Sequence, residues 1–362
     1  MTLLKNDGIL PLRKDKIKKI AVIGPHADNA RMFFGGYTHI SMMESIYAVA
    51  NSIAGVAGIE NTTGKTIPTV PGTDIQLDQG EEYDAILRTQ KPDCPSLLEY
   101  LKAYAPSCEI VYAKGYDIAG QDQSGFDEAL QMIGQADLAI LTLGGKYGTC
   151  SLASMGEGVD ATDINLPECQ DAFIEQAAEI GKPLVGVHIF GRPNSSDIAD
   201  EKLHAILEAW NGAECGAEAI VQTLFGENDP AGRLPVSVAY KSGQIPIYYN
   251  HPWGSAESQS GSIGFANYVD MSHSPRYPFG HGLSYAEFYY RDLHIENREV
   301  DTMGDIVCSF FLKNVSDCAG DEVVQVYVSD RFASRTRPVM ELAAFERIPL
   351  QPHEEKEIIC HI

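Results

Sequence analysis

The chain has 362 residues, of which 44% are hydrophobic, and its 27 Lys and Arg against 50 Asp and Glu give a formal net charge of -23. This length predicts about two domains with room for a buried core. The excess of carboxylates repels phosphate backbones and anionic lipid surfaces, so nucleic acid and membranes are poor candidates for partners. The ordinary apolar fraction, without a Gly or Pro repeat, excludes collagen-like, disordered and coiled-coil classes.

The sequence shows no pattern that directs export or membrane insertion. No apolar run approaches the ~18 residues that a membrane helix needs, and the opening residues 1–7 lack the apolar core of a signal peptide. The eight cysteines are scattered without zinc-site or disulfide spacings, and we interpret them as reduced core thiols. Together these observations predict a cytoplasmic location.

In the first part of the chain, short apolar runs alternate with helical patterns. The runs that predict strands are residues 17–24, 109–113, 137–143, 183–190 and 205–210. The patterns that predict helices are residues 96–104, 126–133, 167–180 and 215–224. Strands that are apolar on both faces and separated by helices predict an α/β fold, an open and mainly parallel sheet with helices on both faces.

Residues 52–93 interrupt this alternation. They are rich in Gly, Thr, Asp, Gln and Pro, and their periodicity is weak apart from residues 81–87. A connection of this length inside a compact domain is usually an active-site loop, a lid or a disordered insertion. We predict an irregular insertion here, and both a functional loop and a solvated loop stay open.

From residue 288 onward the pattern changes to short alternating strands. They are expected at residues 288–295, 305–313, 322–329, 340–348 and 357–362. Period-two runs separated by turn residues predict an immunoglobulin-like β-sandwich, although such a domain takes ~100 residues and fewer are present. The sequence therefore predicts an α/β domain over residues 1–287 and a partial β-sandwich over residues 288–362.

Glu157 is the natural catalytic candidate, because it stands between two glycines in the segment SMGEGVDATDINLP, residues 154–167. The segment follows a predicted strand and precedes a helix, so it lies at a carboxyl strand end, where open α/β sheets place their sites. Flanking glycines let the backbone bring a carboxyl group close to a ligand. Asp160 and Asp163 lie nearby, but Asp163 could simply cap a turn. A mobile acidic turn without function stays the alternative.

Neither a metal site nor a nucleotide site stands out. The ten histidines include no His-x-x-x-His pair and no Cys/His pair at zinc spacing, and His188 lies on an apolar strand as a core group would. Residues 24–28 follow the first strand as a phosphate loop does, but lack the GxGxxG and GxxxxGK(S/T) patterns. No cofactor is expected, and a flavodoxin-like nucleotide binder is disfavoured.

Several motifs follow one another along the chain: LLKNDGILPL (3–12), IAVIGPHAD (20–28), GGY (35–37), GEGVDATDINLP (156–167), GENDPAGRLP (226–235), GQIPIYYN (243–250) and RYPFGHGLSY (276–285). Together they closely resemble the C-terminal half of glycoside hydrolase family 3 enzymes, the β-glucosidases and β-xylosidases. The later stretch TRPVMELAAFERIPL (336–350) is similar to the fibronectin type III-like module of that family. The resemblance covers nearly the whole chain.

The resemblance implies retaining hydrolysis of β-glucosides or β-xylosides from the non-reducing end. An Asp attacks the anomeric carbon, while a second carboxyl group protonates the leaving oxygen and later activates water. In the family the acid/base Glu comes from a loop of the α/β domain, and the matching position here is Glu157. Asp160 matches an acidic position that shapes this loop, although Ala161 stands where an Arg often follows. Tyr37 and His39 match a loop near the active-site rim, where they could contact sugar or aglycone, or only pack.

The family's nucleophile belongs to an N-terminal TIM barrel, and no segment of this sequence resembles that barrel. A general acid without its nucleophile loses most of the rate enhancement, so we expect the isolated chain to be inactive. The expected partners are a β-linked sugar and a TIM-barrel domain on a separate chain, as in a fragment, a truncated chain or a split enzyme. The alternative is a non-catalytic carbohydrate-binding or scaffold module left after loss of the barrel.

Overall fold

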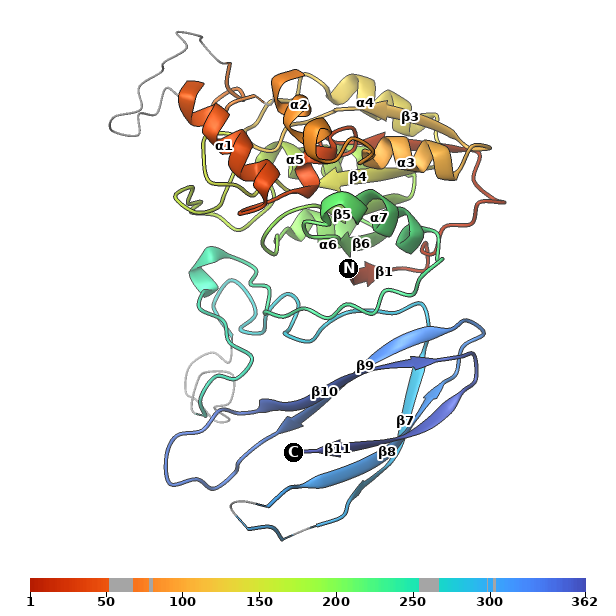
Figure 1. Ribbon diagram of the computed structural model, residues 1–362, viewed down its shortest axis with the longest axis vertical. Helices are drawn as coiled ribbons and strands as arrows, with labels where there is room; N and C mark the ends of the chain where they lie inside the picture. The colour runs from red at the N-terminus through yellow and green to blue at the C-terminus, as the bar shows by residue number, and fades with distance from the viewer. Residues whose placement is uncertain (52–67, 78–80, 254–266, 298, 302–303) are drawn as a thin grey trace. The chain divides into compact units, whose positions relative to one another are not determined.

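The computed structural model describes residues 1–51, 68–77, 81–253, 267–297, 299–301 and 304–362 (Figure 1). The chain divides into two compact units: residues 3–226 together with Met1, and residues 227–362 together with Thr2. Much of the predicted insertion, namely residues 52–67 and 78–80, lies outside the described residues. No helix in the described ranges is both long and apolar enough to span a membrane.

A six-stranded sheet forms the centre of the first unit, with the strand order β1-β6-β5-β4-β2-β3. Its strands are β1 (Thr2–Asn6), β2 (Lys19–Ile23), β3 (Glu109–Ala113), β4 (Leu138–Leu143), β5 (Leu184–His188) and β6 (Ala205–Glu208). The pairs β2–β3, β2–β4, β4–β5 and β5–β6 are parallel. Every residue of β4 and β5 is buried, as expected for central strands covered on both faces.

The helices of this unit are α1 (His39–Asn51), α2 (Glu81–Gln90), α3 (Leu97–Tyr104), α4 (Phe126–Gly134), α5 (Glu168–Glu179), α6 (Asp197–Lys202) and α7 (Gly216–Leu224). Helix α3 packs against α7, α5 packs against both α4 and α6, and α1 packs against α2 (Figure 1). Ser96 begins α3 with a capping box, in which its Oγ accepts from the N–H of Glu99 at 3.1 Å.

The predicted α/β class is confirmed, and each predicted strand and helix is present with its bounds within two residues of the prediction. Helix α1 was not predicted, because its buried face carries polar side chains. Ser41, Glu44 and Ser45 are buried there beside Ile40 and Ala48, so the apolar periodicity that marks a helix is weak. The short elements β1 and α6 were also missed, and α2 lies inside the segment predicted as an irregular insertion, where only the periodicity of residues 81–87 indicated it.

The second unit contains two antiparallel sheets, with the strand orders β11-β8-β7 and β10-β9. The strands are β7 (Phe288–Ile295), β8 (Val307–Asn314), β9 (Gly320–Val328), β10 (Glu341–Leu350) and β11 (Glu355–His361). Along β8 every second residue is buried, and Phe310 and Leu312 pack with Val324, Leu350 and Ile358 in one core that both sheets share. This arrangement confirms the predicted β-sandwich class.

Candidate active-site loop

Glu157 lies in the loop that joins β4 to α5, at the carboxyl end of a central strand. Backbone contacts fold this loop back onto the strand end. The N–H of Ser154 donates to the carbonyl of Lys146, and the N–H of Gly148 donates to that of Met155, both at 3.0 Å. The Ser154 Oγ also accepts from the N–H of Lys146 at 3.0 Å. The loop therefore has a defined base, from which Glu157 projects as an exposed side chain.

The two glycines beside Glu157 make a tight turn. The N–H of Gly156 donates to the carbonyl of Val159 at 3.0 Å, and the N–H of Val159 donates back at 3.1 Å. Gly156 has a φ of +147°, and a Cβ there would lie 1.7 Å from the carbonyl oxygen of Gly148. Only glycine fits that position. Gly158 has a φ of +71°, but no atom lies within 4 Å of its would-be Cβ.

Tyr37 contacts the candidate acid directly, because its phenol donates a hydrogen bond to the Glu157 carboxylate. This bond raises the pKa of the Tyr37 phenol, since a phenolate would face a carboxylate. The segment before Tyr37 is fixed by Gly36, whose N–H donates to the carbonyl of Tyr147 at 3.2 Å. The Tyr37 side chain is 66% exposed, so the pair is open to a ligand.

The other predicted residues do not join this contact. His39 begins α1 and Asp160 follows the turn, and both are exposed. Within the part of the chain that the structure describes, no hydrogen bond joins either of them to Glu157. Asp163 makes a local turn, because its Oδ1 accepts from the N–H of Asn165 at 3.1 Å and from its side-chain amide at 2.7 Å.

A buried cluster of charges beneath the loop was not found from the sequence. It consists of Arg31, Glu44 and Lys146, with the exposed Asp84 at its edge. The sequence does contain one indication of this cluster. Lys146 follows two glycines directly after the apolar strand β4, and the loop of Glu157 begins at the same strand end. Because charged side chains are seldom fully buried unless paired, a lysine so close to a central strand was a reason to seek a carboxylate.

Two buried histidines lie near the carboxyl ends of sheet strands: His26 follows β2 and His188 ends β5, with β4 between these two strands. The Nε2 of His26 lies 3.0 Å from the carbonyl oxygen of Gly145, and burial lowers the pKa of His26 to about 4. The Nδ1 of His188 lies 3.3 Å from Oε2 of Glu208, and burial raises the pKa of Glu208. Among the described residues, no group of three or more His, Cys, Asp or Glu side chains could hold a metal ion.

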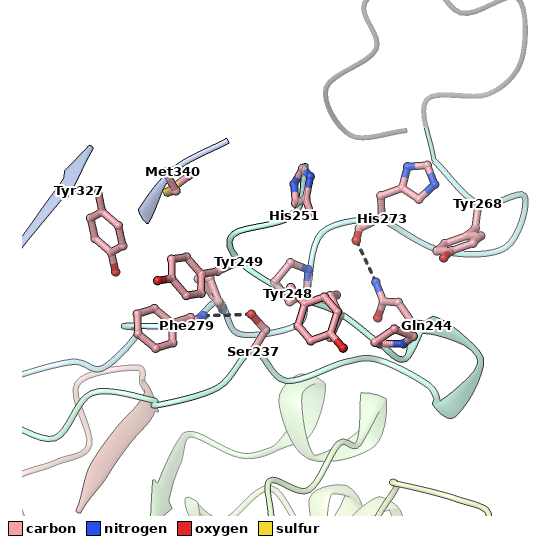
Figure 2. A pocket seen from close by; sticks show the side chains of 14 residues that line it. Ser237, Gln244, Tyr248, Tyr249, His251, Tyr268, His273, Phe279, Tyr327 and Met340 are labelled. Carbon is pink, nitrogen blue, oxygen red and sulfur yellow. Dashed lines mark hydrogen bonds between the residues drawn. The ribbon is translucent and has the colours of Figure 1, made fainter. Parts of the chain in front are cut away.

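A cavity of about 450 Å³ lies within the second unit (Figure 2). Its wall includes the ring of Tyr249, stacked on Phe279 with the centroids 4.1 Å apart. The amide of Gln244 donates to the carbonyl of His273 at 3.0 Å, and Ser237 Oγ accepts from the N–H of Phe279 at 3.3 Å (Figure 2). These polar groups are engaged in hydrogen bonds within the wall itself. The exposed carboxyl group of Glu157 is the better candidate for chemistry, so we place the candidate active site at its loop.

The protein combines two kinds of unit. One is a parallel α/β unit, which carries an exposed glutamate on a loop at a strand end, and the other is a β-sandwich. Residues 1–285 match the Glycosyl hydrolase family 3 C-terminal domain, and residues 322–362 match the Fibronectin type III-like domain. The chain therefore belongs to glycoside hydrolase family 3, and the resemblance seen in its motifs is confirmed.

Curated relatives are enzymes of this family. The chain is 33% identical to a periplasmic beta-glucosidase of Salmonella typhimurium, over 99% of this chain and 43% of the relative. It is 32% identical to a beta-xylosidase of Formosa agariphila, over 98% of this chain and 42% of the relative. The chain thus spans less than half the length of these two relatives.

Solved structures show the same likeness. A beta-glucosidase from Listeria innocua in complex with isofagomine matches with a TM-score of 0.76 and 28% identity, over 100% of this chain and 43% of that chain. The same beta-glucosidase in complex with glucose matches with a TM-score of 0.75 and 28% identity, over 100% of this chain and 42% of that chain. These likenesses extend over both units of the chain described here.

The predicted cytoplasmic location is wrong: the Salmonella relative, which matches nearly the whole chain, is periplasmic. The prediction rested partly on the scattered cysteines. Five of them are buried as free thiols, Cys94, Cys150, Cys169, Cys308 and Cys360. Buried thiols are inert because oxidants reach them poorly. Reduced cysteines therefore carry little information about the compartment.

Proposed function

We propose that this chain supplies the general acid/base of a retaining β-glycosidase acting on β-glucosides or β-xylosides, with Glu157 in that role. The observation that carries the proposal is the contact between the Tyr37 phenol and the Glu157 carboxylate at the tip of a fixed loop. A general acid must be presented to substrate in a defined orientation, and the glycine turn with its phenol partner provides one. The names of the Salmonella and Formosa relatives support the substrate class.

In the first step of such a mechanism, Glu157 in its protonated form would give its proton to the glycosidic oxygen as the bond to the anomeric carbon breaks. In the second step, the Glu157 carboxylate would take a proton from the water that attacks the glycosyl-enzyme intermediate. Tyr37 would hold the carboxyl group in one orientation through both steps. Asp160 and His39, which are both exposed, are candidates for contact with the sugar or aglycone.

The nucleophile of this reaction would come from a TIM-barrel domain outside these residues, and the isolated chain would be inactive. The exposure of Glu157 supports this arrangement, because a general acid works best in a site from which other groups exclude water. The chain covers less than half of the Salmonella and Formosa relatives, which supports this arrangement too.

The test is reconstitution. The chain would be mixed with a family 3 barrel domain and assayed on aryl β-glucosides and aryl β-xylosides. We expect hydrolysis from the mixture, from neither component alone, and nearly none with Glu157→Ala. Glu128→Ala, an exposed carboxyl on α4, is the matched control and should keep full activity. Undiminished hydrolysis by a mixture with Glu157→Ala would refute the role.

A second candidate function is a non-catalytic carbohydrate-binding module. It is favoured by the exposed rings of Tyr248 and Tyr268, which line the cavity of the second unit, because aromatic faces suit the apolar faces of sugars. Calorimetry of the chain with glucose, xylose and their β-linked dimers separates the two functions. Binding that Tyr248→Ala abolishes, with no turnover in any barrel mixture, would favour the binding module.

A further inference from the structure

We propose that Glu44 is a positioning residue for the pair formed by Tyr37 and Glu157, acting through a buried ion pair with Lys146. The inference rests on the proposed role of Glu157 and extends it. Glu44 contacts neither Tyr37 nor Glu157 in the hydrogen bonds of the site, so its effect passes through the segments that carry them.

The Glu44 carboxylate is shared between two cations. Its Oε1 lies 3.0 Å from Nη1 of Arg31, and its Oε2 lies 2.5 Å from Nζ of Lys146. The side chains of Glu44, Arg31 and Lys146 are only 1%, 3% and 3% exposed. Asp84 provides a second carboxylate, with its Oδ1 3.1 Å from Nε of Arg31. Charges so deeply buried must stay paired, so the cluster has one favourable arrangement and resists small displacements.

The two ends of the ion pair lie on the two segments that form the candidate site. Glu44 lies on α1, which begins two residues after Tyr37. Lys146 lies at the base of the loop, where its N–H and carbonyl both bond to Ser154, three residues before Glu157. One buried carboxylate therefore links the segment of the phenol to the base of the loop that carries the candidate acid.

Neutral contacts join the same two segments and allow the charged one to be tested alone. The Oγ of Ser45 lies 2.9 Å from Oγ1 of Thr149, and Gly36 donates to the carbonyl of Tyr147. These contacts remain when the ion pair is removed. Because they still join the two segments, we expect the fold of the unit to persist without the ion pair. Loss of the pair itself should shift the base of the loop and separate Tyr37 from Glu157.

Two substitutions remove the ion pair in different ways. Glu44→Gln leaves the cations of Arg31 and Lys146 facing a neutral amide, and it can fail to fold because an unpaired buried charge is costly. Lys146→Met leaves the balanced pair of Glu44 and Arg31, so this variant should fold. Lys202→Met, at a lysine that forms an ion pair with the exposed Glu201, is the matched control.

The first measurement uses the chain alone. The ionisation of Tyr37 is followed by ultraviolet absorbance, as the difference between each protein and the same protein carrying Tyr37→Phe. We expect an elevated phenol pKa in wild type and in Lys202→Met, and a value near the ordinary one in Lys146→Met and in any folded Glu44→Gln. An unchanged elevated pKa in Lys146→Met would overturn the proposal.

The second measurement uses the mixture with a barrel domain. Lys146→Met should lower kcat by on the order of tenfold or more, with KM little changed, because the acid is misplaced while sugar binding remains. Glu157→Gln in the same assay keeps the two claims apart. Activity retained by Glu157→Gln would refute the proposed function, whereas activity lost there but full in Lys146→Met would refute only the role of Glu44.

Discussion

The phenol of Tyr37 donates a hydrogen bond to the carboxylate of Glu157, although the two residues are 120 positions apart. Tyr37 follows β2 and Glu157 follows β4, and these strands are parallel neighbours in the sheet. Because parallel neighbours end at the same edge, the topology brings the two loops together. The contact links the candidate acid to a segment that lies far from it in the sequence.

Replacing Tyr37 by Phe should lower kcat of the reconstituted enzyme by about three- to tenfold, because one charge-assisted hydrogen bond is lost while the ring remains. The melting temperature should not change, since the phenol is largely exposed. Tyr248→Phe, another exposed phenol, is the control. A Tyr37→Phe enzyme with wild-type kcat would show that the contact does not serve catalysis.

The same hydrogen bond predicts a pH dependence. The pKa of Tyr37 is raised above its ordinary value, so the phenol stays protonated and able to donate throughout the neutral range. The contact should therefore persist from neutral pH up to ~10, the ordinary tyrosine value, and be lost as the pH rises through the elevated pKa. A difference titration against Tyr37→Phe checks this. A phenol that ionises at or below its ordinary pKa would contradict the hydrogen bond.

The two glycines of the acidic turn should respond differently to alanine. In Gly156→Ala the new Cβ would meet the carbonyl oxygen of Gly148 at 1.7 Å, so the turn must move. In Gly158→Ala there is open space, and the left-handed backbone costs only about 1–2 kcal/mol. We expect Gly156→Ala to abolish activity in the mixture and Gly158→Ala to keep much of it. Equal losses in the two variants would argue against a fixed turn.

His26 predicts how stability depends on pH. Burial lowers the pKa of His26 to about 4, while the unfolded chain should protonate near the ordinary value of ~6.5. Because the folded pKa is the lower one, stability is fully present above pH ~6.5 and is lost as the pH falls towards ~4, by about 3 kcal/mol. Urea unfolding at pH 7 and pH 4.5 measures this loss. It should shrink in His26→Asn and persist in His294→Asn, an exposed control. Identical pH dependence in wild type and His26→Asn would contradict the assignment.

The central strands and the motif loop could be predicted from the sequence because their patterns are local. Strands β4 and β5 are continuous apolar runs, and the turn around Glu157 is marked by its glycines. Helix α1 could not be predicted, because the polar side chains on its buried face are stabilised by partners distant in sequence. Glu44 is the clearest example: its cations come from residues 31 and 146.

The motifs that identify the family do not all serve the site. Asp229, in the motif GENDPAGRLP, accepts a hydrogen bond from the N–H of Tyr285 at 2.6 Å and from that of Ala286 at 3.3 Å. It also accepts from the N–H of Asp321 at 3.2 Å. Asp229 thus joins two motif regions of the second unit. A family motif can therefore preserve the fold rather than the active site. The contacts of its residues in the structure show which of the two it does.

The most direct test of the account is the dependence of Glu157→Gln on the leaving group of the substrate. In the reconstituted enzyme, this variant should lose about 10²- to 10⁴-fold in rate on an alkyl β-glycoside, whose leaving oxygen needs a proton. It should keep most of its glycosylation rate on a dinitrophenyl β-glycoside, which departs without one, and added azide should yield the β-glycosyl azide. A loss of equal size on both substrates, with no azide product, would contradict the assignment of Glu157 as the acid/base.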